Sequence, residues 1–342
     1  MLIAYMRTQA HMRITHNTLI NKHLRTDMTF LFNLAIVAAL LCGVTSCAKS
    51  ELETEQPSVA VEFSAQLADM HTRLETLGKG VSVNALHYNI YDADSKVHLE
   101  ALSGRSSRLA DGSFKFRVEL LKGTKYDIVL WAQDSTSTAY TLDGNVVTVN
   151  YRNADNTAAA EANDDSRDAF YKFVDNFNPT SPTAVTRFAL TRPFAQLNAA
   201  ASNMDIAAAQ SNGITILSST ISTRCYTTFN IATGAVGGLT DNPIEFTATA
   251  TPSSNNEELI AGYNYLSMNY LLAPADGDTV DVTFIFNTNR SDLVLRNSYH
   301  NIPIKANYRT NLLGTLLSRS TEFNVSIDTI WAEEELNENS PL

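Results

Sequence analysis

The chain has 342 residues, of which 44% are hydrophobic and 18% are charged, enough apolar material for one large or two ordinary globular domains. Its 25 Lys and Arg against 36 Asp and Glu give a net charge of -11, so no basic field exists to collect phosphates, and a nucleic-acid partner is excluded. Three Cys are too few for a disulfide scaffold, and no Cys or His cluster has zinc-binding spacing. Short runs of Val, Ile, Thr, Tyr and Phe favour β structure.

The N-terminus has the features of a signal peptide. An apolar run at 30–41 has the length of a signal-peptide core and is shorter than the roughly 20 apolar residues that a membrane span needs. The sequence VTSC at 44–47 resembles a bacterial lipobox, in which the peptidase cuts before a cysteine that carries a diacylglyceryl group. We therefore expect a signal peptide at 1–46 and a lipid on Cys47. The alternative is a generic cleavage site near an unmodified Cys47.

The polar segment at 47–58 predicts a tether, because it cannot bury a core. It contains Glu51, Glu53 and Glu55. Acidic residues just after a lipid-bearing cysteine resemble the surface-export signals of Bacteroidales lipoproteins. The sequence therefore favours a protein that is held at the outer membrane by a lipid on Cys47 and is exposed at the cell surface.

Alternation of apolar with polar or small residues predicts half-buried strands along the rest of the chain. The first strand is expected at 59–67, where Val59, Val61, Phe63, Ala65 and Leu67 point to one side. Further strands are expected, in chain order, at 86–90, 114–120, 126–131, 146–151, 185–190, 214–216, 226–231, 244–248, 280–286 and 323–327. Strands this closely spaced lack the crossovers of at least about a dozen residues that a parallel sheet needs, so antiparallel β-sandwiches are expected.

Two short helices are predicted between the strands. Apolar residues recur at the helical spacing i, i+3, i+4 and i+7 over 170–177, after capping oxygens at 163–166. A second helix is predicted over 202–211, ending at Gly213. The four apolar residues of the first helix are Phe170, Phe173, Val174 and Phe177.

The segment NPTSPT at 178–183 is the predicted domain boundary, because Pro and Ser interrupt regular structure there. It divides the mature chain into an N-terminal domain at 59–183 and a C-terminal domain at 184–332, each of sandwich size. An acidic tail is expected at 333–342.

Seven segments carry a resemblance to a known family: YDADSK (91–96), YDIVLWAQD (126–134), ANDDSRDAFYKF (162–173), LTRPFAQLN (190–198), YTTFNIATG (226–234), YNYLSMNYLL (263–272) and NYRTNLLGTLLS (307–318). In this order they resemble fimbrillin-like lipoproteins of Bacteroidales, over 59–327. The resemblance implies two tandem transthyretin-like antiparallel β-sandwich domains with short helical insertions. It also implies a role as shaft, anchor or tip subunit of surface fimbriae.

In that family, subunits are joined by strand donation. An arginine-specific protease cuts off the first strand of the precursor, and the emptied groove accepts a strand of another subunit. By resemblance, the first strand here is 59–67, whose groove-facing residues are the five named above, and the arginine that follows it is Arg73. The alternative is that Arg73 is an ordinary solvated loop residue.

Acidic residues elsewhere have structural explanations. Asp164 and Asp165, with Asp168 nearby, stand at a predicted helix start, where acidic residues are expected as caps. Asp92 and Asp94 lack the Gly and the distal Glu of a calcium loop and predict a turn.

The histidines and Cys225 give no sign of a reactive site either. The histidines are scattered, and Cys225 is expected to pack as a small hydrophobe, since the sequence places no partner beside it. We therefore expect no catalytic residue, no metal site and no cofactor.

The sequence bears on three functions. The favoured one is a structural or adhesive subunit of fimbriae, with other subunits or a host surface ligand as partners and the fimbrium as its location once polymerised. The alternative is a lipid-anchored glycan-binding accessory protein, which would need exposed aromatic platforms. A hydrolase on a sandwich would need a pair of converging carboxylates, and no spacing indicates one.

Overall fold

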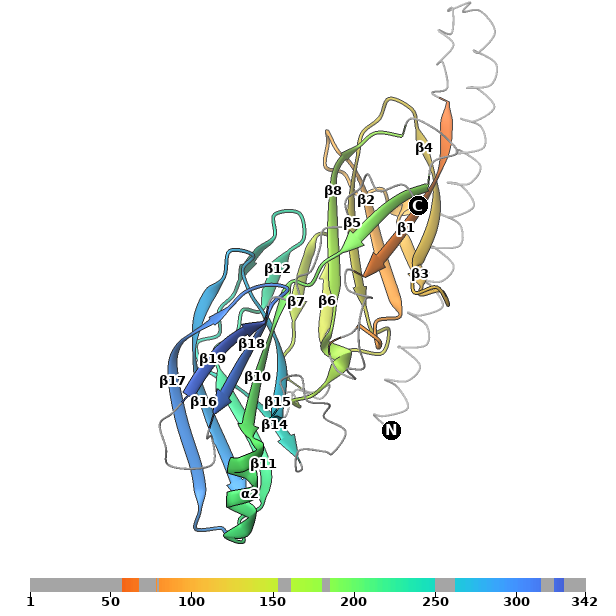
Figure 1. Cartoon of the computed structure of the whole chain (residues 1–342). Helices are drawn as coiled ribbons and strands as arrows, with labels where there is room; N and C mark the ends of the chain where they lie inside the picture. The colour runs from red at the N-terminus through yellow and green to blue at the C-terminus, as the bar shows by residue number, and fades with distance from the viewer. Residues whose placement is uncertain are drawn as a thin grey trace, which may run out of the picture. The chain divides into compact units, whose positions relative to one another are not determined.

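The structure is a computed structural model that describes residues 57–67, 78, 80–152, 161–179, 185–249, 262–314 and 323–328. In this part of the chain, strands dominate and lie in five sheets, with one α-helix (Figure 1). The all-β sandwich fold expected from the sequence is confirmed. None of the described helices is long and apolar enough to cross a membrane.

The first sandwich consists of a sheet with strand order β4-β1-β9 and a sheet with order β3-β2-β5-β8. Their apolar faces enclose the first core, which includes Phe63, Phe114, Phe116 and Ile128. A 3-10 helix, η1 (Glu100–Leu102), precedes β3. The strands are β1 (Ser58–Leu67), β2 (Ala85–Asp92), β3 (Gly104–Ser107), β4 (Phe114–Leu121), β5 (Tyr126–Gln133), β8 (Phe170–Phe177) and β9 (Val185–Leu190).

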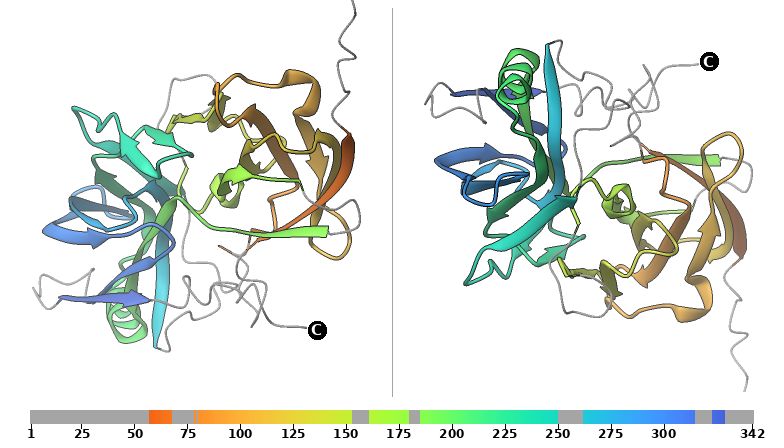
Figure 2. Two further views of the ribbon diagram at one scale, coloured as in Figure 1. Left: turned by 90° about the horizontal axis from the view of Figure 1, so that it is seen from above. Right: turned by 90° about the horizontal axis from the view of Figure 1, so that it is seen from below.

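The second sandwich pairs a sheet of order β15-β10-β18-β19 with one of order β14-β11-β16-β17 (Figure 2). Phe246, Phe284 and Phe286 lie in the second core. The elements are β10 (Phe194–Ser202), α2 (Asn203–Ser211), β11 (Ile216–Thr223), β14 (Ile244–Thr249), β15 (Tyr263–Leu272), β16 (Asp278–Thr288), β17 (Val294–Ile304), β18 (Arg309–Gly314) and β19 (Phe323–Asp328).

The two sandwiches have the same topology. The order β4-β1-β9 corresponds to β15-β10-β18, and β3-β2-β5-β8 corresponds to β14-β11-β16-β17, with corresponding strands in the same chain order. The second sandwich adds β19 at the edge, beside β18. A repeated fold is therefore present without a repeat at a fixed period in the sequence, because insertions of different length separate the matching strands.

Two inserted hairpins join into a further sheet. β6 (Tyr140–Asp143) and β7 (Val146–Val149) lie between β5 and β8, while β12 (Thr228–Asn230) and β13 (Ala235–Gly237) lie between β11 and β14. β7 pairs with β12, giving the order β13-β12-β7-β6. This sheet is therefore formed by one hairpin inserted in the first sandwich and one inserted in the second.

β5 is buried along its whole length. Ile128 and Leu130 belong to the first core, whereas Val129 and Trp131 belong to the second core. Both faces of this strand are therefore covered, which explains its nearly continuous apolar sequence.

The predicted helix at 170–177 is wrong, since these residues form β8. Phe170 and Val174 contact the first core, and Phe173 between them contacts the second. Two residues, Asp175 and Asn176, lie opposite the single residue Asp127, and this bulge returns the side chain of Phe177 to the first core. Because this strand is covered on both faces and contains a bulge, its apolar residues fall at the spacing that is typical of a helix.

Among the described strands, the pairing is antiparallel except at two places, and outside the strands the isolated bridge between Glu161 and Thr247 is also parallel. β1 runs parallel to β9, and β10 runs parallel to β18. Each parallel pair joins the first strand of a sandwich to a strand near the end of the same sandwich. The strands between them form the long connection that parallel pairing needs, although neighbouring strands in the sequence are too closely spaced to provide it.

The predicted second helix is confirmed as α2. The Ser202 side chain accepts a hydrogen bond from the backbone N–H of Asp205, the arrangement of an N-cap. Beyond the helix, Gly213 has φ +69°, a left-handed conformation that glycine adopts without strain.

The structure does not test the domain boundary at 178–183. β9 follows that segment and pairs with β1 in the first sandwich, and the chain enters the second sandwich at Phe194. The division into two domains at 59–183 and 184–332 stays a prediction.

Candidate functional site

β1 is the middle strand of its sheet. It pairs antiparallel with β4 from Ser58 to Ala65 and parallel with β9 from Glu62 to Leu67 (Figure 1). The side chains expected to face a groove all lie in the first core: Val59, Val61, Phe63, Ala65 and Leu67. The structure therefore brings these five residues together, and their part in strand donation stays a prediction.

Phe63 is enclosed by aromatic rings from three other strands. Its ring centroid lies 4.9 Å from that of Phe116 and 5.6 Å from that of Phe188, both stacked, and 5.2 Å from that of Phe177 in an edge-on contact. Tyr88 stacks on Phe116 at 4.0 Å. Phe116, Phe177 and Phe188 are called the aromatic pocket below. Such contacts add to the stabilisation from burial alone.

Gly80 packs closely against the Leu67 end of β1. A Cβ atom placed on Gly80 would lie 2.7 Å from Cδ1 of Leu67 and 2.9 Å from Cε2 of Phe170, and the residue has φ +64°. Only glycine satisfies both the close approach and the left-handed backbone. The chain that follows β1 thus comes back against the strand's end.

Polar contacts fix the backbone from Gly78 onward. Arg192 Nη2 donates to the carbonyl of Gly78 at 2.7 Å, and the N–H of Gly78 donates to Asp165 Oδ1 at 2.8 Å. Arg108 Nη1 donates to the carbonyl of Gly80 at 2.6 Å, and the Ser82 hydroxyl donates to the carbonyl of Asp165 at 2.6 Å. Residue Arg73 and residue Cys47 lie outside the described residues.

A buried ion pair supports this anchorage. Arg192 Nε and Nη2 donate to the two carboxylate oxygens of Asp168 at 2.8 and 3.0 Å, and both side chains are 0% exposed. The guanidinium carbon of Arg192 also lies 4.2 Å from the ring centroid of Phe170. In the sequence, Arg192 lies in the segment LTRPFAQLN and Asp168 lies near the predicted cap, and neither position indicates that the two side chains pair.

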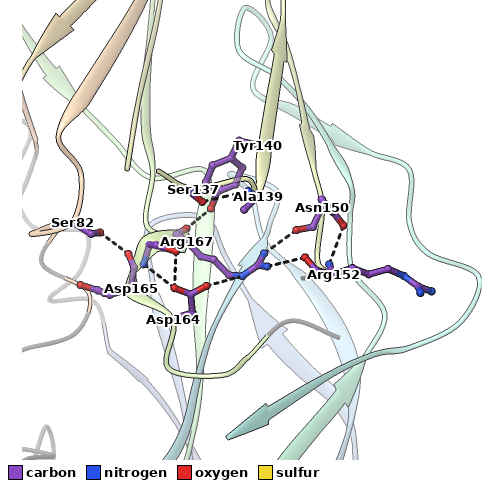
Figure 3. Close-up of polar contacts among 10 residues, drawn as sticks. Ser82, Ser137, Ala139, Tyr140, Asn150, Arg152, Asp164, Asp165 and Arg167 are labelled. Carbon is purple, nitrogen blue, oxygen red and sulfur yellow. Dashed lines mark hydrogen bonds and ion pairs between the residues drawn. The ribbon is translucent and has the colours of Figure 1, made fainter. Parts of the chain in front are cut away.

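The acidic segment before β8 forms a single 3-10 turn, η2 (Asp165–Arg167), which Figure 3 shows. Asp164 accepts the Ser166 N–H at 3.1 Å and so caps η2, whereas the helix at 170–177 that it was expected to cap is absent. Arg167 contacts Asp164 at 3.3 Å and donates to the carbonyl of Asn150 at 2.9 Å. The hydroxyl of Tyr140 donates to the carbonyl of Arg167.

Asp165 links η2 to the second sandwich. Its Oδ1 accepts the Tyr270 hydroxyl at 2.6 Å as well as the Gly78 N–H. Burial raises the pKa of Asp165, and burial together with nearby carboxylates raises the pKa of Tyr270. These groups hold chain segments together, a role that capping alone does not describe.

The other candidates have structural roles. Asp92 accepts from the N–H and the hydroxyl of Ser95, both at 2.7 Å, which is the predicted turn. Cys225 is buried as predicted, and burial raises the pKa of its thiol. Within the described ranges, no three His, Cys, Asp or Glu residues are grouped to hold a metal ion.

Two sandwiches of one topology, in the first of which the first strand is seated between two others, define an all-β sandwich protein. The chain belongs to the family of unknown function DUF6562, whose profile matches residues 53–341. No curated protein matches the sequence.

Three solved structures from Bacteroidales are similar in fold, at low sequence identity. One is a Bacteroides ovatus protein provisionally described as a cell adhesion protein, with 14% identity, a TM-score of 0.46 and coverage of 80% of this chain and 98% of that one. Another is the tip fimbrial protein Mfa3 of Porphyromonas gingivalis, C-terminally truncated, with 13% identity, a TM-score of 0.40 and coverage of 80% and 99%. The third is a fimbrial assembly protein of Parabacteroides distasonis, with 12% identity, a TM-score of 0.42 and coverage of 79% and 99%.

Proposed function

We propose that the chain is a cell-surface lipoprotein of the fimbrillin type, a structural or adhesive subunit of fimbriae that assembles by strand exchange after cleavage at Arg73. The observation that carries the proposal is the position of β1 between β4 and β9. Loss of a middle strand exposes unpaired backbone groups on both neighbours and uncovers the apolar face that it had buried. A groove of that kind is satisfied by another extended strand.

The described residues give the glycan-binding alternative no support. Among them, the exposed large hydrophobic side chains are all Val, Leu or Met, and none is aromatic. The aromatic side chains that reach the described surface, such as Tyr226 and Tyr308, are half-buried. Binding of the intact protein to a glycan array would revive this alternative.

Lipid anchoring is tested by Cys47→Ser. Because the apolar run at 30–41 is too short to span a bilayer, the variant is expected to lose membrane retention, as measured by fractionation with and without detergent. Cys225→Ser is the matched control, since that thiol is buried and should leave retention unchanged. A Cys47→Ser protein still found in the membrane fraction would contradict the lipobox.

Cleavage is tested by limited digestion of the folded precursor with an arginine-specific protease. A cut after Arg73 is expected. The cut protein is then expected to form oligomers, whose fraction increases with protein concentration. Arg73→Lys is the matched control, because it keeps the charge and removes the cleavage site. A cut protein that loses β1 and stays monomeric and as stable as the precursor would contradict strand exchange.

A further inference from the structure

We propose that the groove beneath β1 selects its strand by side-chain size, requiring a large aromatic residue at the position of Phe63 and a small one at the position of Ala65. The proposal rests on the proposed function, because it describes which strand the groove accepts. The partner is accordingly an extended strand with alternating apolar residues, in which an aromatic side chain stands two residues before a small one.

The aromatic requirement follows from the aromatic pocket. Phe63 is 0% exposed and contacts Phe116, Phe177 and Phe188, which come from β4, β8 and β9. A smaller side chain at this position would leave a void lined by three rings, whose contacts have no replacement. The pocket is therefore made for one large flat side chain.

The small-residue requirement follows from the next inward position. Ala65 is 0% exposed, and its partners across the sheet are Phe114 on β4 and Phe188 on β9. Both neighbouring rings are buried in the first core. A second large side chain between them would have to displace one of the rings, and overpacking of this kind is unfavourable.

The two requirements together also fix the register. A slip of one residue turns the apolar side chains away from the core and is excluded by alternation alone. A slip of two residues keeps them on the core side, but it moves either Phe63 or Leu67 into the place of Ala65. The size requirement rejects this second slip, and so it provides specificity that alternation does not.

One described strand meets the alternation and the aromatic requirement at its first three inward positions but lacks the small residue, and its Thr288 falls at the position of Leu67. β16 presents Val280, Val282, Phe284 and Phe286 on alternate positions. Aligned with β1, these match Val59, Val61 and Phe63, but Phe286 falls at the position of Ala65. A peptide of Asp278–Thr288 is thus a natural negative control.

The test uses the full chain after cleavage at Arg73, with β1 held only by non-covalent contacts. Labelled peptides of Ser58–Leu67 are added in excess, and their incorporation is measured by native mass spectrometry and fluorescence anisotropy. The set is the unchanged peptide, Glu62→Ala at an exposed position, Phe63→Ala, Ala65→Phe, and the β16 peptide. Across these five peptides the protein is unchanged, so differences in binding among them cannot come from its folding.

The unchanged and Glu62→Ala peptides are expected to bind alike, and the other three at least about tenfold more weakly. Cleaved Phe188→Ala protein, which has one ring fewer beside position 65, is expected to regain binding of the Ala65→Phe peptide. Similar binding of all five peptides would overturn the size requirement and leave strand exchange intact. Incorporation of none, including the unchanged peptide, would overturn strand exchange itself and the size requirement with it.

Discussion

Among single residues, the buried Arg192–Asp168 pair has the clearest energetic consequence. Two charges removed from water are costly unless their hydrogen-bonding groups are well satisfied. Two parallel hydrogen bonds to Asp168 and a third to the Gly78 carbonyl satisfy Nε and Nη2 of Arg192. The pair therefore determines where the chain after β1 is fixed.

We expect Asp168→Asn to reduce the free energy of unfolding by about 3 to 5 kcal/mol, because it leaves Arg192 buried without its counter-charge. Urea unfolding followed by tryptophan fluorescence measures the change. Asp292→Asn is the control, since the Arg290–Asp292 pair is equally short, 2.8 Å, but exposed to solvent, and no measurable loss is expected. Equal losses for both variants would show that burial of the pair is unimportant.

Asp165 predicts a dependence on pH. Burial raises its pKa above the ordinary 3.8, so the native chain keeps this proton to a higher pH than the unfolded chain does. The contribution of Asp165 to the free energy of unfolding must therefore fall as the pH rises from 3.8, the pKa in the unfolded chain, to the raised pKa in the native chain. Asp165→Asn keeps an oxygen that can accept from Gly78 and Tyr270 but cannot ionise.

The stability of Asp165→Asn relative to the unchanged protein is therefore expected to increase between about pH 4 and pH 7, as measured by urea unfolding at each pH. Asp292→Asn is the control, because the hydrogen bond with Arg290 lowers the pKa of Asp292, so that this carboxylate stays ionised across the range and no change with pH is expected. A difference for Asp165→Asn that stays constant across this range would contradict the argument.

At the scale of elements, sequence reasoning succeeded where one face of an element is buried. β1 alternates cleanly and was predicted within one residue. The helix α2, in which only Asp205 is buried, was predicted instead from its composition and the glycine that ends it. β8 was misassigned because both of its faces are covered and because a bulge opposite Asp127 changes its period. Neither the burial of both faces nor the bulge can be inferred from the sequence of 170–177 alone.

The candidate site shows the same limit. Alternation identified the five inward side chains of β1. The residues that enclose them, including Phe177 and Phe188, come from strands more distant in the sequence, and their contact depends on a parallel pairing that was not foreseen. Pairing of remote strands is a property of the whole fold, so a local pattern cannot provide it.

For the whole molecule, the repeated topology and the separate cores favour two units, while the sheet formed by the inserted hairpins favours coupling between them. β7 and β12 are joined over only three residue pairs. The second core, however, also includes Trp131 and Tyr140 from the N-terminal half of the chain. Which tendency dominates is a question of cooperativity that unfolding can answer.

Phe116→Ala and Phe284→Ala test it, one in each core. Each is expected to destabilise its own sandwich by about 3 to 5 kcal/mol, as large-to-small changes in a core do. If the sandwiches unfold separately, calorimetry will resolve two transitions, and each variant will lower only one of them. Lys115→Ala and Thr279→Ala, exposed on the same two strands, should move neither. A single transition that both core variants lower equally would mean that the two sandwiches unfold as one cooperative unit, coupled by the hairpin sheet and by the N-terminal residues in the second core. Such a result would contradict a domain boundary at 178–183.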